Sequence, residues 1–72
     1  MSVTVLWMGG ETEIEGDYLS VRDVLDRMNR LHPDAKYFMA RNEKGELLKP
    51  SLELTNKQRI VVIQKPEYAE ER

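Results

Sequence analysis

The chain has 72 residues, of which 11 are basic and 13 acidic, so its formal net charge at pH 7 is −2, and it contains no cysteine. This near-neutral balance gives no electrostatic reason to expect nucleic acid or an acidic membrane as a partner, and the lack of cysteine excludes disulfides and thiolate metal sites. A chain of this length forms one small domain that buries roughly 60% of its unfolded surface. The N-terminal residues lack the basic region of a signal peptide, and no apolar run reaches membrane-spanning length, so we expect a cytoplasmic protein.

Residues 3–15 predict a β-hairpin. Residues 3–8 are rich in β-formers and have a period of two, in which Val3, Val5 and Trp7 alternate with Thr4, Leu6 and Met8. Residues 11–15 alternate again, and Gly9-Gly10 separates the two runs. Two adjacent glycines favour a two-residue turn, which places Val5 opposite Ile14 and Trp7 opposite Thr12. In this register one face of the hairpin collects the residues that we expect to pack against the core: Val3, Val5, Trp7, Thr12 and Ile14.

Residues 19–33 predict an amphipathic helix that covers this face. Ser20 is a suitable N-cap, and Asp23 three residues later can reach back to it as in a capping box. His32 precedes Pro33, and a residue before proline is pushed out of the α conformation, so the helix ends there. We interpret His32 as a cap at the helix C-terminus, where a partly protonated imidazole suits the dipole. The predicted buried stripe is Val21, Val24, Leu25, Met28 and Leu31.

The second half of the chain predicts three further strands. Residues 36–41 form the first of them, a turn follows at residues 42–45, and a short return strand at residues 46–48 ends before Pro50. The last strand contains four successive apolar residues, Ile60, Val61, Val62 and Ile63, which is typical of a central strand covered on both faces. We place it beside the first strand. The predicted domain spans residues 1–65, and residues 66–72 are expected to be a charged, flexible tail.

This order of elements, ββαβ(β)β, predicts an α+β fold in which one helix crosses one face of a mixed sheet. It resembles ubiquitin and the small ubiquitin-like and sulfur-carrier proteins, whose fold is the β-grasp roll. The segments that carry the resemblance are the hairpin around Gly9-Gly10, the capped helix from Ser20, the strand at residues 37–40, the turn that closes in Gly45, and residues 55–58 leading into the last strand. The resemblance implies partner binding through the face of the sheet.

The resemblance has one departure. Ubiquitin-like modifiers and sulfur carriers end in Gly-Gly, because the terminal carboxylate is adenylated in a narrow enzyme site. This sequence has no glycine after Gly45. We therefore do not expect this chain to be activated or attached to other proteins.

The titratable residues do not predict an active site. Four acidic residues share one face at a spacing of two: Glu11, Glu13, Glu15 and Asp17. Two such carboxylates can bind a cation or act as acid and base. Far more often such a row is a solvated face that also protects an edge strand from pairing, and this is our interpretation. His32 is the only histidine. We predict no catalytic, cofactor or metal site, and hence no enzyme.

The sheet face opposite the helix is the candidate functional surface. Leu6 and Met8 point to it, together with one alternating set of the third strand (Tyr37/Met39 or Phe38/Ala40) and one of the last strand (Ile60/Val62 or Val61/Ile63). Monomers rarely expose such a contiguous apolar patch without using it. We therefore predict a protein-interaction module whose partner is a protein. The predicted contact residues are Leu6, Met8, Met39, Arg41, Val61 and Ile63.

Several alternatives stay open at this point. Long flanking side chains could cover the patch of a monomer, or the patch could close a weak homodimer. The resemblance also allows a relative of the modifiers and sulfur carriers without their diglycine. A further alternative is a small accessory subunit of a multicomponent enzyme or of a viral assembly, in which the β-grasp fold recurs.

Overall fold

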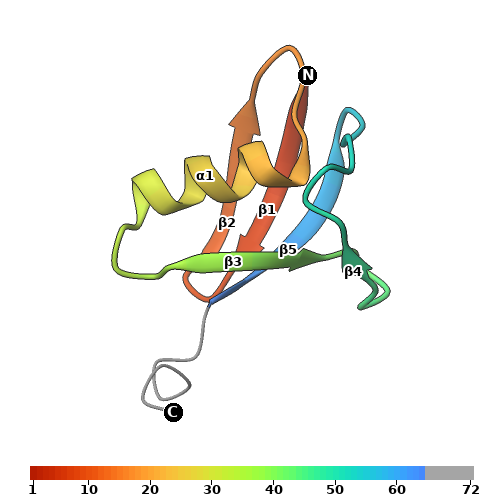
Figure 1. Cartoon of the computed structure of the whole chain (residues 1–72). Helices are drawn as coiled ribbons and strands as arrows, with labels where there is room; N and C mark the ends of the chain where they lie inside the picture. Colours follow the sequence, from red (N-terminus) through yellow and green to blue (C-terminus); the bar gives the residue numbers. More distant parts are fainter. Residues whose placement is uncertain (65–72) are drawn as a thin grey trace.

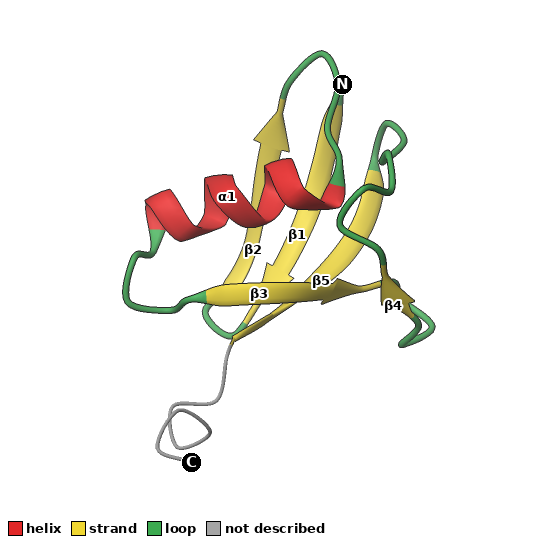
Figure 2. Cartoon of the chain, in the orientation of Figure 1, coloured by secondary structure: helices red, strands yellow, loops and turns green. Residues whose placement is uncertain are grey.

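The computed structural model describes residues 1–64, in which one helix packs across one face of a five-stranded sheet (Figures 1 and 2). The predicted tail lies outside the described residues. The elements are β1 (Ser2–Trp7), β2 (Gly10–Glu15), α1 (Val21–Leu31), β3 (Tyr37–Arg41), β4 (Leu47–Leu48) and β5 (Gln58–Gln64). Within the described range, the helix is neither long enough nor apolar enough to cross a membrane.

The sheet is mixed, with the strand order β2-β1-β5-β3-β4. The central strands β1 and β5 run parallel, and every other neighbouring pair is antiparallel. This confirms the predicted α+β class and the place of the last strand beside the first. Figure 1 shows α1 lying across β1 and β2, so that the helix covers one face of the sheet and leaves the other.

The hairpin forms, but its predicted register is wrong by two residues. Trp7 pairs with Gly10, and Val5 pairs with Thr12 instead of Ile14, so the turn residues are Met8 and Gly9. The indole of Trp7 explains the position of Gly9, because a Cβ there would lie 2.1 Å from the ring. Of the two glycines, only Gly10 has a positive φ, at 137°. A slip of two residues keeps every side chain on its predicted face.

The helix begins as predicted. The backbone N–H of Ser20 donates to Asp23 Oδ2 (3.0 Å), and the N–H of Asp23 donates to Ser20 Oγ (3.2 Å), which completes the capping box. The hydrogen bonds from the backbone and hydroxyl of Ser20 lower the pKa of the Asp23 carboxyl. His32 is the C-cap, also as predicted. Leu31 was expected in the buried stripe but is 54% exposed, because it lies beyond the part of α1 that contacts the sheet.

A β-bulge interrupts β3. Tyr37 pairs with Gln64 and Met39 with Ile63, so Phe38 is an extra residue opposite a single step of β5. The side-chain amide of Asn29 on α1 bonds both backbone groups of Tyr37, accepting from its N–H (2.7 Å) and donating to its carbonyl (2.9 Å). These bonds tie the start of β3 to the helix.

The core lies between α1 and the sheet. Val3 and Val5 of β1 are fully buried there, as predicted, and Ile14 of β2 is nearly so. From β5 the core takes Ile60 and Val62, which settles the alternative left open by the sequence. Leu54, from the segment before β5, is also buried, whereas Leu52 in the same segment is 40% exposed. The remaining buried residues are Leu19, Val21, Val24, Leu25, Met28, Tyr37 and Ala40.

Candidate functional site

The sheet face that turns away from α1, called the outer face below, is crossed by one row of paired residues. Paired residues of neighbouring strands point to the same side of a sheet. The pairings Glu11–Leu6, Leu6–Val61, Val61–Arg41 and Arg41–Leu47 connect all five strands in sequence. The row therefore reads acidic, apolar, apolar, basic and apolar from β2 to β4.

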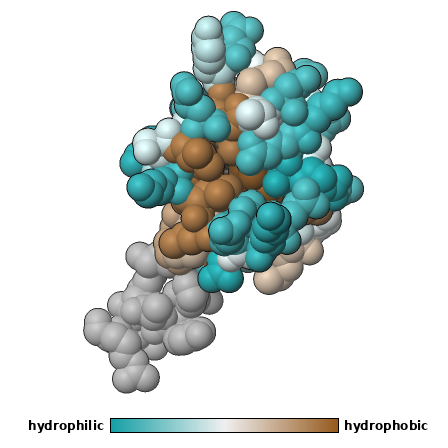
Figure 3. Space-filling view, turned by 90° about the vertical axis from the view of Figure 1, so that its right-hand side faces the viewer, coloured by the Kyte–Doolittle hydropathy of each residue, from teal (hydrophilic) through white to brown (hydrophobic). Residues whose placement is uncertain are grey.

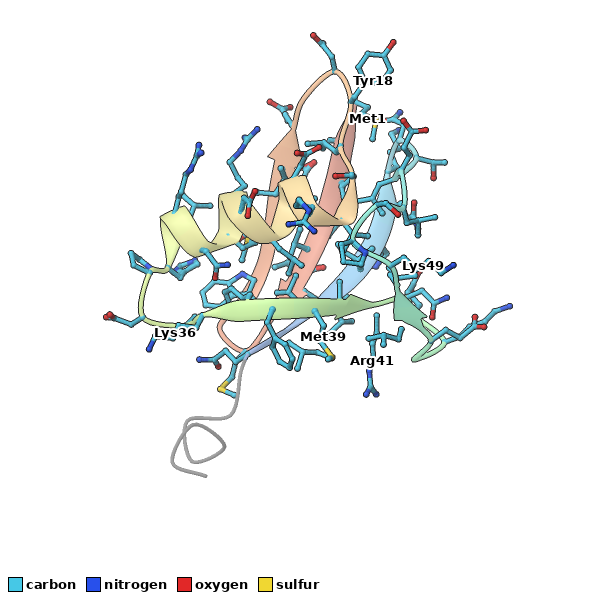
Figure 4. All side chains as sticks on the ribbon, viewed as in Figure 1. Met1, Tyr18, Lys36, Met39, Arg41 and Lys49 are labelled. Atoms are coloured by element: carbon cyan, nitrogen blue, oxygen red, sulfur yellow. The ribbon has the colours of Figure 1, made fainter. Side chains whose placement is uncertain are left out.

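A second row lies next to the first at the end of β5. Met39 of β3 pairs with Ile63 of β5, and both side chains are half-buried on the outer face. Figure 4 shows Met39 and Arg41 extending from β3 on the same side, away from α1. Because of the bulge, Phe38 also leaves the core and is 45% exposed. Neither alternating set predicted for β3 is correct, since Tyr37 and Ala40 are both buried and Phe38 and Met39 both lie outside.

The structure brings five of the six predicted contact residues together in these two rows. They are Leu6, Met39, Arg41, Val61 and Ile63. The prediction placed Met8 in the first strand, but β1 ends at Trp7. Met8 occupies the hairpin turn and is 89% exposed, because the turn is one residue earlier than expected.

A shallow apolar hollow marks the edge of the outer face at the ends of β1 and β5. Leu6, Met8, Val61 and Ile63 contribute to its lining. The apolar surface is not confined to this hollow. Phe38 and Leu47 extend it toward β3 and β4. Figure 3, which views the molecule from the right-hand side of Figure 1, shows apolar surface bordered by hydrophilic residues on that side as well.

The charges on the outer face are separated across the strands. The edge strand β2 carries the predicted acidic row, Glu11, Glu13 and Glu15, all of them exposed. Arg59 of β5 forms an ion pair with Glu11 (3.0 Å) and approaches Glu43 of the turn between β3 and β4 (3.7 Å). Within residues 1–64 no carboxylate lies within ion-pair distance of Arg41, on the other side of the apolar centre.

Trp7 and His32 form a second aromatic feature, between the hairpin turn and the end of α1. Their ring centroids are 4.3 Å apart, and the indole Nε1 of Trp7 donates to Thr12 Oγ1 (2.9 Å). Trp7 thus packs against the core, which agrees with its interpretation as a core residue. The imidazole of His32 is engaged with this indole. Over the described part of the chain, no group of three or more His, Asp or Glu residues is placed to hold a metal ion.

Sequence reasoning missed two residues of the outer face. Leu47, on the edge strand β4, is 61% exposed and pairs with Arg41. The hairpin-like turn at residues 42–45 could have revealed it, because such a turn sets Leu47 opposite Arg41. Phe38 carried no such signal, since the bulge is a break in the register between β3 and β5 that the alternation of β3 does not indicate. Compared with protein-family models, curated proteins and solved structures, the chain has no significant match.

Proposed function

We propose that this chain is a β-grasp domain that acts as a non-enzymatic protein-interaction module, and that its partner binds to the outer face. The observation that carries the proposal is the side-chain content of that face. Six apolar residues from four strands lie there with no helix above them within residues 1–64: Leu6, Phe38, Met39, Leu47, Val61 and Ile63.

The outer face exposes apolar surface that a partner can remove from water. Removing apolar surface from water stabilises a complex by about 25 cal/mol per Å² before the costs of association are counted. Phe38 and Leu47 are both large and substantially exposed, and half-buried aliphatic side chains lie between them and β1. An arrangement with an apolar centre and charged borders is typical of protein interfaces.

The borders define the chemistry of the partner. Arg41 offers a guanidinium next to Val61, so it suits a partner carboxylate at the border of an apolar contact. The acidic row of β2 suits basic groups on the opposite border. The β-grasp assignment rests on the element order and on the position of the last strand beside the first.

Affinity capture with two matched variants tests this proposal. Phe38→Glu places a carboxylate in the outer face. Leu31→Glu places one on α1, away from that face, at a large apolar side chain whose exposure is similar to that of Phe38. With N-terminally tagged protein and native lysate, we expect wild type and Leu31→Glu to retain the same proteins and Phe38→Glu to lose them by at least about tenfold. Circular dichroism of both variants checks that they are folded.

Two results would contradict the proposal. Equal capture by both variants would mean that the outer face is not the contact surface. Proteins of higher mass that stay attached through a strongly denaturing wash would mean covalent attachment instead of binding.

A further inference from the structure

We propose that the partner for which the outer face is built is a second copy of this chain, related by a two-fold axis that runs parallel to the strands between β1 and β5. This inference rests on the proposed role of the outer face as a binding surface and names its occupant. It follows from the order of chemical groups along the row that crosses the sheet.

The row is self-complementary about that axis. From β2 to β3 it reads Glu11, Leu6, Val61 and Arg41. A two-fold rotation about an axis between β1 and β5 exchanges the positions of the two middle residues and of the two outer residues. Two copies placed face to face in this way set Leu6 of each against Val61 of the other, and Glu11 of each against Arg41 of the other.

The end charges of this row, Glu11 and Arg41, favour this axis over the other in-plane choice. A two-fold axis perpendicular to the strands would place β2 above β2 and oppose the two rows of glutamates, and like charges brought together at an interface cost several kcal/mol. The axis parallel to the strands places β2 of each copy above β3 of the other, so that Glu11 faces Arg41. Face-to-face sheets commonly pack with their strands within about 30° of each other. At such an angle the row of one copy lies nearly along the row of the other.

Within one chain, Glu11 and Arg41 cannot pair with each other. Two strands lie between β2 and β3, so three strand spacings of about 4.8 Å separate the two residues, or roughly 14 Å. If the effect of reversing the charge at one of these positions depends on the charge at the other, the two positions must therefore meet between two molecules. Glu11 also holds Arg59 of its own chain, so it can bridge two guanidinium groups when a second copy is present.

Charge reversal at the two positions tests the inference. Glu11→Arg opposes two arginines at each of the two symmetric contacts, and Arg41→Glu opposes two glutamates. We expect each variant alone to self-associate at least about tenfold more weakly than wild type in sedimentation equilibrium. An equimolar mixture of the two restores an opposite-charge pair at both contacts, so we expect it to form dimers with about the affinity of wild type.

The control pair is Asp26→Arg and Arg30→Glu, at exposed positions of α1. These variants change the net charge by the same amounts as the test pair. They therefore show whether the difference in net charge between two chains is enough by itself to make a mixture associate. We expect the control variants, alone and mixed, to sediment as wild type does. Circular dichroism checks the fold of all four variants.

A wild-type chain that stays monomeric to millimolar concentration would overturn the inference. A mixture of Glu11→Arg and Arg41→Glu that associates no better than either chain alone would also overturn it. The proposed function can survive this failure, because loss of a captured partner by Phe38→Glu, with retention by Leu31→Glu, would still show that the outer face binds another protein.

Discussion

Trp7 links three parts of the molecule at the scale of single residues. Its ring lies over Gly9 of the hairpin turn, stacks with His32 at the end of α1, and donates a hydrogen bond to Thr12 of β2. These contacts fix the turn beside the helix terminus. They also hold the end of β1 in place, where Leu6 contributes to the outer face.

The close approach of Trp7 to Gly9 predicts a specific sensitivity. A Cβ at position 9 would lie 2.1 Å from the indole ring, so the ring must move in Gly9→Ala. We expect this substitution to lower the free energy of unfolding by about 1–3 kcal/mol, as is typical of overpacking. Urea denaturation measures the change. In a Trp7→Leu background the same substitution should cost much less, and an equal cost in both backgrounds would show that the ring is not the cause.

At the scale of elements, the helix depends on its capping box. Asp23 accepts hydrogen bonds from the backbone and hydroxyl of Ser20, and these bonds lower the pKa of its carboxyl from the ordinary value of 3.8. A lowered pKa in the folded state means that folding favours the charged form. The resulting stability is present above pH 3.8 and is lost as the pH falls through the lower pKa of the folded state.

Asp23→Ala should therefore lower the free energy of unfolding at pH 7 by more than it does at pH 2. The measurement is urea unfolding of both proteins across this pH range. Asp26→Ala on the same helix serves as the control, because Asp26 takes no part in the capping box. A difference between wild type and Asp23→Ala that stays constant down to pH 2 would contradict the role of the charged carboxylate.

The elements themselves could be predicted from the sequence because their signals are local. Ser20 and Asp23 mark the start of α1, Pro33 marks its end, and the apolar run at residues 60–63 identifies a central strand. The faces of β1 and β2 were also predicted correctly although the register was not. Alternation has a period of two, so an error of two residues changes the partners and leaves the faces intact.

The part that could not be predicted depends on contacts between distant segments. The turn lies at Met8 and Gly9 because Trp7 packs over Gly9, and alternation alone carries no trace of that contact. The bulge at Phe38 follows Tyr37, whose backbone is hydrogen-bonded by Asn29 of the helix. Each of these features changed the candidate site: the first moved Met8 into the turn, and the second added Phe38 to the outer face.

At the scale of the whole molecule, the sheet separates two apolar surfaces. The helix covers one of them, and on the other Leu6, Val61, Ile63 and Met39 remain half-buried within residues 1–64. No single strand supplies this outer face, since its two rows join residues that are distant in the sequence. The β1–β5 pairing brings the apolar centre together, and the edge strand β2 contributes the acidic border.

The central claim is that the outer face makes the contact with a second copy of this chain, and a dilution series of ¹⁵N-labelled protein followed by NMR tests it most directly. We expect concentration-dependent shifts at the amides of Leu6, Met39, Arg41, Val61 and Ile63, with the amides of α1 unchanged. Shifts confined to α1 or to the hairpin turn would contradict the claim, because the contact would then lie on another surface.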